Sequence, residues 1–374
     1  METADRRAVC SAHVDEDFLR ARIRSGVSET HCSYCDGTGE EPFAVTWPVF
    51  VEALLVGIGV YYQPHTVPGD AVAAREVAVE ISTAAGISHP HLVDDLVEAL
   101  DVTPGWMHRE HHSGRGIEQL IYSWDAFKHI VKYEMRYFFA TRPTGDSDEM
   151  TAGQVLKAVS DLGEHHPSVW PVPCPAPLFR ARMAISHDEA ASWHHAADLG
   201  PPPPERAAAN RMSPAGISIF YGATDRATAV AEAGAHAAFR YVTTAEFTPT
   251  RQLRLIDLTN LPAVPSIFDI SARQDFYVLR FLRMFIHDIT LPVELDGREH
   301  IDYVPTQVFT EYFRFAFPDQ VDGLMFPSAQ GPGNNVAIFV GSDRCADVGA
   351  ETERTRLRMD PATLQVSRVV TVAR

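Results

Sequence analysis

The chain has 374 residues, of which 45% are hydrophobic and 22% charged, so wholesale disorder is excluded and a sizeable buried core is expected. At about 150 residues per domain, this length predicts two or three domains. The 32 Lys and Arg residues against 49 Asp and Glu give a net charge of −17, which repels phosphate backbones and makes nucleic acid an unfavourable partner.

The sequence shows neither a membrane span nor a secretory signal. Its longest apolar stretch, residues 47–62, is interrupted by Glu52 and is too short to cross a bilayer comfortably. The first ten residues lack an apolar signal core. We therefore expect a cytoplasmic protein with no membrane partner. Its five cysteines are too few and too unevenly placed for a disulfide scaffold.

Residues 1–40 contain two chelating pairs, Cys10-x-x-His13 and Cys32-x-x-Cys35. Each two-residue spacer lets two side chains converge on one ion, and three thiolates with one imidazole suit tetrahedral zinc. The alternative is that the cysteines are buried hydrophobes and that His13 is incidental. Because both pairs have the right spacing, we predict a zinc knuckle, structural because four protein ligands leave no open position.

Residues 41–165 have the pattern of an all-helical middle domain. Over 47–58, apolar residues recur at three- and four-residue steps, as one buried helix face requires. The segments 71–84, 91–100 and 124–139 read the same way, and a further helix is predicted from residue 151.

A Pro-rich boundary at residues 167–177 precedes a change of texture. Over 166–374, short β-type runs alternate with helical runs, which predicts a mixed domain and makes the whole chain α+β. The predicted strands cover residues 178–184, 217–221, 239–247, 253–258, 323–326, 336–340 and 366–372. The predicted helices cover residues 227–238, 275–289 and 303–317.

Residues 211–232 hold the pattern that bears chemistry: a loop, a tight turn at 214–216, a strand, a second loop and a helix that Thr224 or Asp225 can cap. Arg211 and Tyr221 lie across the turn from each other. Glu232 lies two turns into the helix, where it faces either solvent or a cleft. Taken singly, each is more often a surface charge, a core aromatic or a solvated carboxylate.

Taken together, these residues resemble the signature of the RES-domain family, which is named for its Arg, Glu and Ser. Its Gly-Arg-x-Ser-x-x-Gly motif corresponds to residues 210–216, with Asn210 in place of the first Gly, and is followed by the strand Tyr and the helix Glu. The resemblance continues in the opening strand at 178–182, in Tyr303-Val-Pro-Thr-Gln307, in the Asp-Gly motif ending at Ser328 and in the strand that begins Asn334-Asn335. It covers about residues 178–339.

The first half also resembles a known region. Cys10, Cys32-x-x-Cys35 and the motif Trp124-x-x-Phe127-x-x-x-Val131-Lys are similar to the zinc-containing helical N-terminal region of a subset of RES proteins, which is associated with HEPN-type domains. The resemblance implies a helical region beside an ADP-ribosyltransferase-like RES domain.

The RES resemblance implies an enzyme that consumes NAD as a substrate, and known members act as toxins by phosphorolysis or hydrolysis. Because the nicotinamide leaving group is already cationic, it needs no general acid, and one carboxylate can stabilise the oxocarbenium transition state. Glu232 is the candidate for that role, with Arg211 on the pyrophosphate and Tyr221 against the nicotinamide or ribose. Further substrate-binding candidates are Ser213, Gly216, Gln307, Ser328, Asn334 and Asn335. If phosphate is a co-substrate, Arg180 or Arg182 is the candidate cation.

Three alternatives stay open. The same site could transfer ADP-ribose to a protein. A HEPN-like RNase uses Arg-x(4–6)-His, which occurs at Arg182/His187 and Arg280/His287, outside the helical half where that chemistry belongs. The chain could also be a non-catalytic, zinc-containing module that binds a protein. An antitoxin or other regulatory protein is a candidate partner, and a homo-oligomer is left open.

Overall fold

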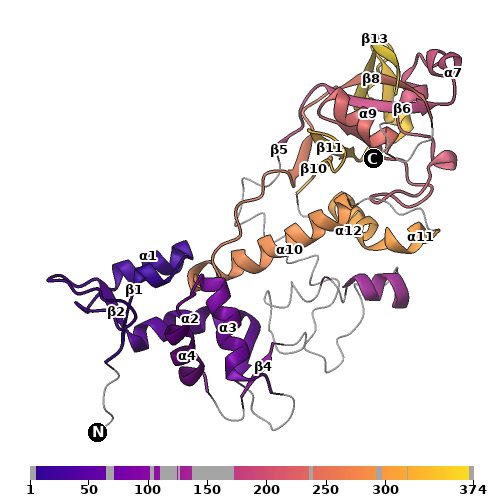
Figure 1. The fold of residues 1–374 in the computed structure, drawn as a ribbon. Coiled ribbons are helices and arrows are strands. Elements are labelled where there is room, and N and C mark those ends of the chain that lie inside the picture. Colours follow the sequence, from indigo (N-terminus) through magenta and orange to yellow (C-terminus); the bar gives the residue numbers. More distant parts are fainter. Residues whose placement is uncertain are drawn as a thin grey trace. The chain divides into compact units, whose positions relative to one another are not determined.

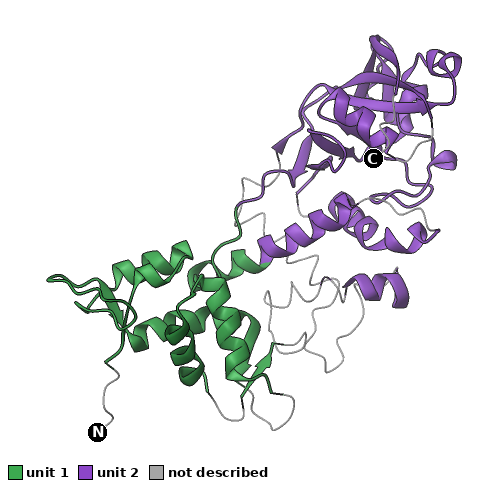
Figure 2. Ribbon diagram, viewed as in Figure 1, with its two compact units in different colours: residues 1–119, 145–149, 263–277 green, residues 120–144, 150–262, 278–374 purple. Residues whose placement is uncertain are grey.

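The computed structural model describes residues 6–64, 71–101, 105–109, 124, 127–136, 172–235, 239–291, 297–317 and 319–369. It divides into two compact units, which Figure 2 distinguishes by colour. Unit 1 comprises residues 1–119, 145–149 and 263–277, and unit 2 comprises 120–144, 150–262 and 278–374. Each unit therefore takes in segments from both halves of the sequence. The helix predicted from residue 151, and much of the one predicted over 124–139, lie outside the described residues.

Unit 1 is mainly helical, with two small sheets (Figure 1). Its helices are η1 (Ser11–His13), α1 (Asp17–Ser25), α2 (Trp47–Tyr61), α3 (Ala74–Ala85), α4 (Pro90–Ala99) and η6 (Ile270–Ala272). Its strands are β1 (Ala8–Cys10), β2 (Ala44–Thr46), β3 (Tyr62–Pro64) and β4 (Trp106–His108). Local chemistry sets the ends: Glu16 accepts the Leu19 N–H at the start of α1, and Gly86 closes α3 in the left-handed conformation, with φ +66°.

The helices predicted over 47–58, 71–84 and 91–100 are confirmed. The expectation that the middle region is all-helical is wrong, because β3 and β4 form an antiparallel pair with Tyr62 opposite His108. Local periodicity cannot detect such a pair, since its two strands are three residues long and far apart in the sequence. The N-terminal segment also pairs with the middle region, through Val9 opposite Val45.

One buried cluster forms the core of unit 1 and includes residues from both the zinc-candidate segment and the helices. Phe268, from the distant segment 263–277, is fully buried in this cluster. It lies directly on α2, where a methyl group added to Gly57 would be 2.5 Å from the Phe268 ring. Arg273 donates to the Val56 carbonyl at 2.6 Å, which ties the same segment to the same helix.

Unit 2 is built on a mixed nine-stranded sheet, in the order β12-β13-β8-β6-β7-β11-β10-β9-β5. The strands are β5 (Val172–Pro173), β6 (Leu178–Ala184), β7 (Phe220–Ala223), β8 (Tyr241–Pro249), β9 (Arg254–Asp257), β10 (Gly323–Pro327), β11 (Asn334–Ile338), β12 (Cys345–Asp347) and β13 (Leu357–Arg368). All neighbours are antiparallel except β9 with β10 and β12 with β13.

Most described helices of unit 2 are short, and the longer ones are α9, α10 and α12. Apart from α10, the helices are the π-helical turn η3 (Ile130–Glu134), α7 (His187–Ala191), α8 (Ala196–Leu199), η5 (Pro204–Arg206), α9 (Arg226–Gly234), α11 (Glu299–Asp302), α12 (Val304–Phe315) and η7 (Ser342–Arg344). The long helix α10 (Arg273–Thr290) gives its first residues to unit 1 and the rest to unit 2. The α+β prediction is confirmed for this region. The last strand differs, since β13 begins at Leu357 and the predicted residues 370–372 lie outside the described chain.

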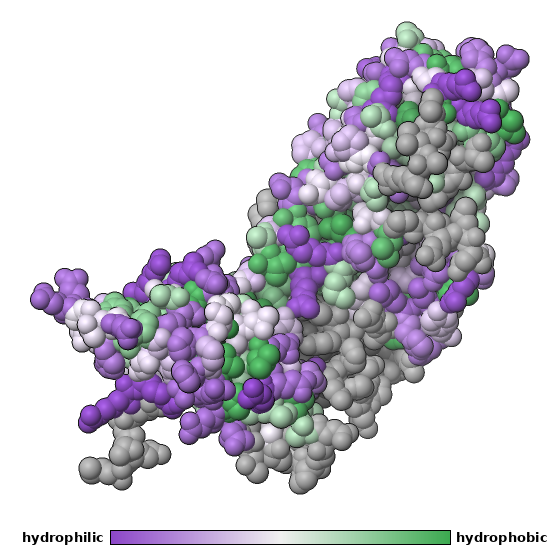
Figure 3. Space-filling view, in the orientation of Figure 1, coloured by the Kyte–Doolittle hydropathy of each residue, from purple (hydrophilic) through white to green (hydrophobic). Residues whose placement is uncertain are grey.

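The surface mixes hydrophilic and hydrophobic residues on the face drawn in Figure 3. Within the described part of the chain, no helix combines the length and the apolar character that crossing a membrane would need.

Candidate active site

A cavity of about 460 Å³ lies in unit 2, beside strands β6, β7, β10 and β11 and helix α9. This volume falls in the range of small-molecule sites. Three arginines line it, namely Arg180, Arg206 and Arg211, and Glu232 is the one carboxylate among the described lining residues. The cavity therefore combines an excess of positive charge with a single acid.

Glu232 reaches the cavity because α9 begins where the sequence predicts. Asp225 caps the helix by accepting the Thr228 N–H at 2.8 Å, which places Glu232 two turns in. Its Oε1 accepts hydrogen bonds from the Ser328 hydroxyl and from Asn335 Nδ2, the latter at 2.7 Å. Two side chains from the β10–β11 hairpin region thus fix this carboxylate in one orientation.

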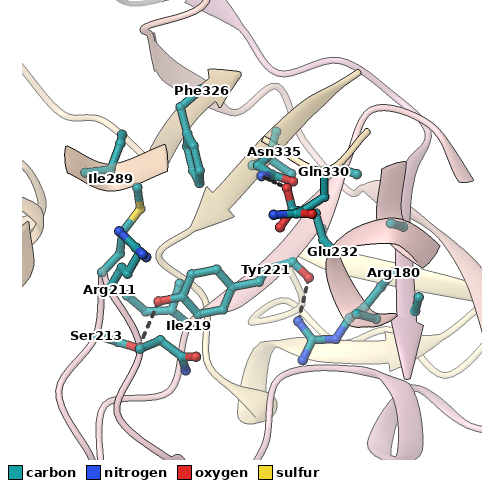
Figure 4. Close-up of a pocket in the computed structure, with 18 of the residues that line it drawn as sticks. Arg180, Arg211, Ser213, Ile219, Tyr221, Glu232, Ile289, Phe326, Gln330 and Asn335 are labelled. Atoms are coloured by element: carbon teal, nitrogen blue, oxygen red, sulfur yellow. Dashed lines mark hydrogen bonds between the residues drawn. The ribbon is translucent and has the colours of Figure 1, made fainter. Parts of the chain in front are cut away.

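Tyr221 lies on β7 with its side chain in the cavity, while its neighbour Phe220 is buried in the core on the opposite face. Its hydroxyl is 2.9 Å from Ser213 Oγ, and Figure 4 shows this contact and the ring beside Arg211. Burial raises the pKa of the Tyr221 hydroxyl to about 12, so the phenol stays neutral. The ring offers a flat face and an uncharged polar end.

Arg211 donates from Nη1 to the backbone carbonyl of Asp288 at 2.6 Å, and its guanidinium lies 5.8 Å from the centre of the Tyr303 ring. Burial lowers the pKa of Arg211, but the charges of Tyr303, Asp288 and Glu232 oppose that shift. A guanidinium has five N–H donors in a planar fork, so one backbone contact leaves others for a ligand.

Arg180 is the second buried cation of the cavity. It donates to the Tyr221 carbonyl at 2.6 Å, and burial lowers its pKa to about 10, which still leaves it charged at neutral pH. Of the two arginines predicted to hold phosphate, Arg180 lines the cavity. Arg182 is not among the described lining residues and instead lies 4.2 Å from the centre of the Trp193 ring.

The structure divides the remaining sequence candidates by place. Ser213 and Asn335 line the cavity, and Ser328 reaches it through Glu232. Gly216 provides the predicted tight turn, with φ +87° and an Ile217 N–H to Pro214 carbonyl bond of 3.1 Å, but it does not line the cavity.

Gln307 and Asn334 do not line the cavity, but they hold segments that carry lining residues. Gln307 Nε2 donates to the carbonyls of Asn210 (2.7 Å) and Ser213 (3.2 Å), so it fastens the loop that carries Arg211. The backbone of Asn334 pairs with Thr224, its carbonyl accepting at 2.9 Å and its N–H donating at 3.0 Å. Both residues hold segments in place without lining the cavity.

Sequence reasoning missed several lining residues. Arg206, Tyr303, Phe326 and Gln330 all face the cavity. Tyr303 and Phe326 lie inside two of the motifs that resemble the RES family, and this position is the signal that could have identified them. Arg206 lies two residues after a run of four prolines and ends the three-residue turn η5, which is too short to give a periodic signal.

The two pairs proposed for an RNase lie elsewhere. His187 begins α7 with its ring 5.9 Å from that of Tyr241, and His287 lies on α10. Arg182, Arg280 and both histidines are absent from the described lining of the Glu232 cavity.

The predicted metal ligands come together in unit 1. The ligand atoms of Cys10, His13, Cys32 and Cys35 all lie within 4.8 Å of one another. Cys10 Sγ is 3.9 Å from Cys35 Sγ, close to the edge of about 3.8 Å that Zn–S bonds of about 2.3 Å give in a tetrahedron. His13 Nε2 is buried and has no hydrogen-bond partner among the described residues, as a nitrogen aimed at an ion would be. The group fits a metal ion such as zinc.

Unit 2 is thus an α+β domain whose mixed nine-stranded sheet frames a cavity with three arginines and, among its described lining residues, one carboxylate. Unit 1 carries a Cys₃His group that could hold a metal ion. Two family models match the chain: the RES domain over residues 177–360 and HEPN/RES N-terminal domain 1 over residues 26–144. The chain belongs to the RES-domain family and carries the HEPN/RES N-terminal domain 1. No curated protein matches it.

Proposed function

We propose that this protein is an NAD-degrading toxin that cleaves the bond between nicotinamide and ribose. The setting of Glu232 supports this proposal most directly. It is the one carboxylate among the described lining residues, it is held by Ser328 and Asn335, and it lies in a cavity with three arginines. Its RES-domain family supports the choice of substrate.

The chemistry needs little more than these groups. The C1′–N bond of the ribose breaks, and nicotinamide leaves as a neutral molecule with the bonding electron pair. The positive charge that remains on the ribose is stabilised by the Glu232 carboxylate. A water or phosphate oxygen then forms a bond to C1′, and a water that attacks gives up its proton to solvent.

The arginines suit the rest of the dinucleotide. Arg211 presents a charged fork to the pyrophosphate, since planar guanidinium groups bind phosphate oxygens two at a time. The Tyr221 ring packs against the nicotinamide or ribose. If phosphate attacks, Arg180 is the candidate to hold it, because Arg180 lines the cavity and Arg182 packs on Trp193 instead.

The Cys₃His group would hold a structural zinc ion, which would stabilise the N-terminal segment and take no part in the reaction. Cys10, His13, Cys32 and Cys35 would supply all four ligands.

The test is NAD consumption by purified protein, with and without phosphate, with products identified by mass. We expect Glu232→Gln to abolish turnover, because it keeps the shape and loses the charge. The matched control is Glu311→Gln on α12, which is exposed and does not line the cavity.

ADP-ribose as product identifies hydrolysis, its phosphate ester identifies phosphorolysis, and mass added to a protein identifies transfer. If wild-type protein that folds normally leaves NAD intact under all these conditions, the proposal is wrong. Equal activity of the two glutamine variants would exclude Glu232 from the reaction.

A further inference from the structure

The motif Trp124-x-x-Phe127 has no part in the chemistry above, yet its segment belongs to unit 2 with the cavity. Trp124 is fully buried, and its ring stacks on Phe127 at 5.3 Å with an interplanar angle of 12°. It also meets Phe281 and Phe285 of α10 edge-on. Trp124, which lies within the region matched by HEPN/RES N-terminal domain 1, thus packs against α10.

Two polar groups of this segment converge on one carboxylate oxygen. Trp124 Nε1 donates to Asp288 Oδ2 at 2.8 Å, and Lys128 Nζ lies 3.1 Å from the same oxygen. The side chains of Lys128 and Asp288 are 27% and 21% exposed, so this ion pair is shielded more than a surface pair.

Asp288 is also the residue that holds Arg211. It lies in the last turn of α10, where backbone carbonyls lack a partner within the helix. Arg211 donates to that carbonyl at 2.6 Å and places its positive charge at the negative end of the helix. Asp288 therefore offers Arg211 two acceptors, a carbonyl that it uses and a carboxylate that it does not.

The carboxylate would be the stronger partner. A bidentate pair between guanidinium and carboxylate has charge on both sides, whereas the carbonyl bond has charge on one side only. In the structure, Trp124 and Lys128 both bond the Oδ2 atom of that carboxylate, while Arg211 bonds the backbone carbonyl and lines the cavity.

We propose that Trp124 and Lys128 are positioning residues for Arg211: they hold the Asp288 carboxylate away from its guanidinium, so that Arg211 stays directed at the pyrophosphate of the dinucleotide. The inference rests on the proposed function for its ligand. Through the contact of Trp124 and Lys128 with the Asp288 carboxylate, the region matched by HEPN/RES N-terminal domain 1 would take part in substrate binding.

The test compares Lys128→Met with Lys128→Met/Asp288→Asn. In the single variant the carboxylate loses its ammonium partner and draws Arg211 from the cavity, so the KM for NAD rises roughly tenfold, the loss of one charge-assisted hydrogen bond, while kcat changes little. In the double variant the carboxamide no longer attracts Arg211, and the KM returns towards the wild-type value.

Lys132→Met is the matched control. Lys132 lies one turn further along the same segment and forms an ion pair with Asp302 at 2.8 Å, so its loss removes a similar contact without touching Asp288. We expect its KM to stay within about twofold of wild type.

A second readout does not need NAD turnover. The Nε–H resonance of Arg211 in ¹⁵N-labelled protein, assigned through Arg211→Lys, should shift in Lys128→Met and return in the double variant. If wild type does not consume NAD, the proposed function fails and this resonance still decides the inference. If Lys128→Met leaves both KM and resonance unchanged, or if Asp288→Asn fails to reverse its effect, the inference is wrong.

Discussion

Ser328 helps to determine which oxygen of Glu232 is left for the proposed reaction. Its Oγ accepts the N–H groups of Gln330 (3.1 Å) and Gly331 (2.9 Å), so its one hydrogen is directed to Glu232 Oε1. Asn335 donates to the same oxygen. Among the described residues, none bonds Oε2, so in the proposed reaction Oε2 is the oxygen that approaches the ribose of NAD.

Asn335→Ala should lower kcat by about tenfold to a hundredfold, because a hydrogen bond to a charged group contributes roughly 1.5–3 kcal/mol. The measurement is steady-state NAD consumption. The adjacent Asn334→Ala is the control, since Asn334 is tied to Thr224 through its backbone, and its rate should stay near wild type. Equal losses in both variants would contradict a role for Asn335 in orienting the Glu232 carboxylate.

The buried thiol of Cys345 should make the free energy of unfolding depend on pH. Burial raises its pKa from 9.0 to about 12, so between these values the folded state retains a proton that the unfolded state has lost. The free energy of unfolding should therefore fall as pH rises from about 9 to 12, by at most about 1.4 kcal/mol per pH unit for this group. Urea titrations under reducing conditions check the slope. Burial raises the pKa of Cys174 over the same range, so Cys345→Ala should reduce the slope without abolishing it, and an unchanged slope would refute this cause.

At the scale of elements, helix α9 carries Glu232, and specific contacts fix the first turn of this helix. The Asp225 side chain accepts from both the N–H and the hydroxyl of Thr228, at 2.8 and 2.7 Å. Helices without such a cap lose stability and fray at the first turn. The register of Glu232 thus depends on a residue seven positions earlier.

Asp225→Ala should lower the free energy of unfolding by about 1 kcal/mol, with Asp225→Ser retaining most of it, since serine also caps. Thermal unfolding followed by circular dichroism measures the difference. If serine and alanine destabilise equally, the cap is not the cause.

Elements that depend on local sequence patterns could be predicted, whereas contacts between residues distant in the sequence could not. The helix over 275–289 and a cap at Thr224 or Asp225 follow from local pattern; α10 confirms the helix, and Asp225 is the residue that caps α9. The β3–β4 pair and the position of Phe268 on Gly57 depend on partners distant in the sequence, and no local period encodes them.

The site residues divide in the same way. The motif predicts Arg211, Tyr221 and Glu232 as a set, and all three line one cavity. The sequence alone could not show that Asn335 lines the cavity and Asn334 does not. That distinction depends on the register of β11, because adjacent residues of a strand face opposite sides of the sheet.

At the scale of the molecule, the two compact units do not follow the order of the chain. Residues 120–144 belong to unit 2, and residues 263–277 belong to unit 1. Each contributes fully buried rings, Trp124 to one and Phe268 to the other. Neither unit can therefore be completed by one continuous stretch of sequence.

A fragment of residues 166–374 should be unstable, because it lacks Trp124 and Phe127 and leaves the rings of α10 and α12 uncovered. In the intact chain, Trp124→Ala should cost about 3–5 kcal/mol. Denaturant unfolding measures the variant, and solubility with heteronuclear NMR assesses the fragment. A well-folded, monomeric fragment would show that these contacts are dispensable.

If the Cys₃His group holds zinc as proposed, removal of the ion should destabilise unit 1. We expect about one zinc ion per chain by elemental analysis, its loss in Cys32→Ser, and a lower midpoint of thermal unfolding in both Cys32→Ser and chelator-treated protein. Cys174→Ser, outside the metal group, is the matched control. Full stability with no bound metal would refute a structural zinc.

The crossed membership of residues 120–144 and 263–277 has a consequence for how the chain can be taken apart. If one peptide bond is cut at an engineered protease site between residues 150 and 166, each of the two pieces keeps a segment that is folded into the unit formed mainly by the other. The two pieces should then elute together from a sizing column. They should separate only when denaturant unfolds the units that hold the exchanged segments.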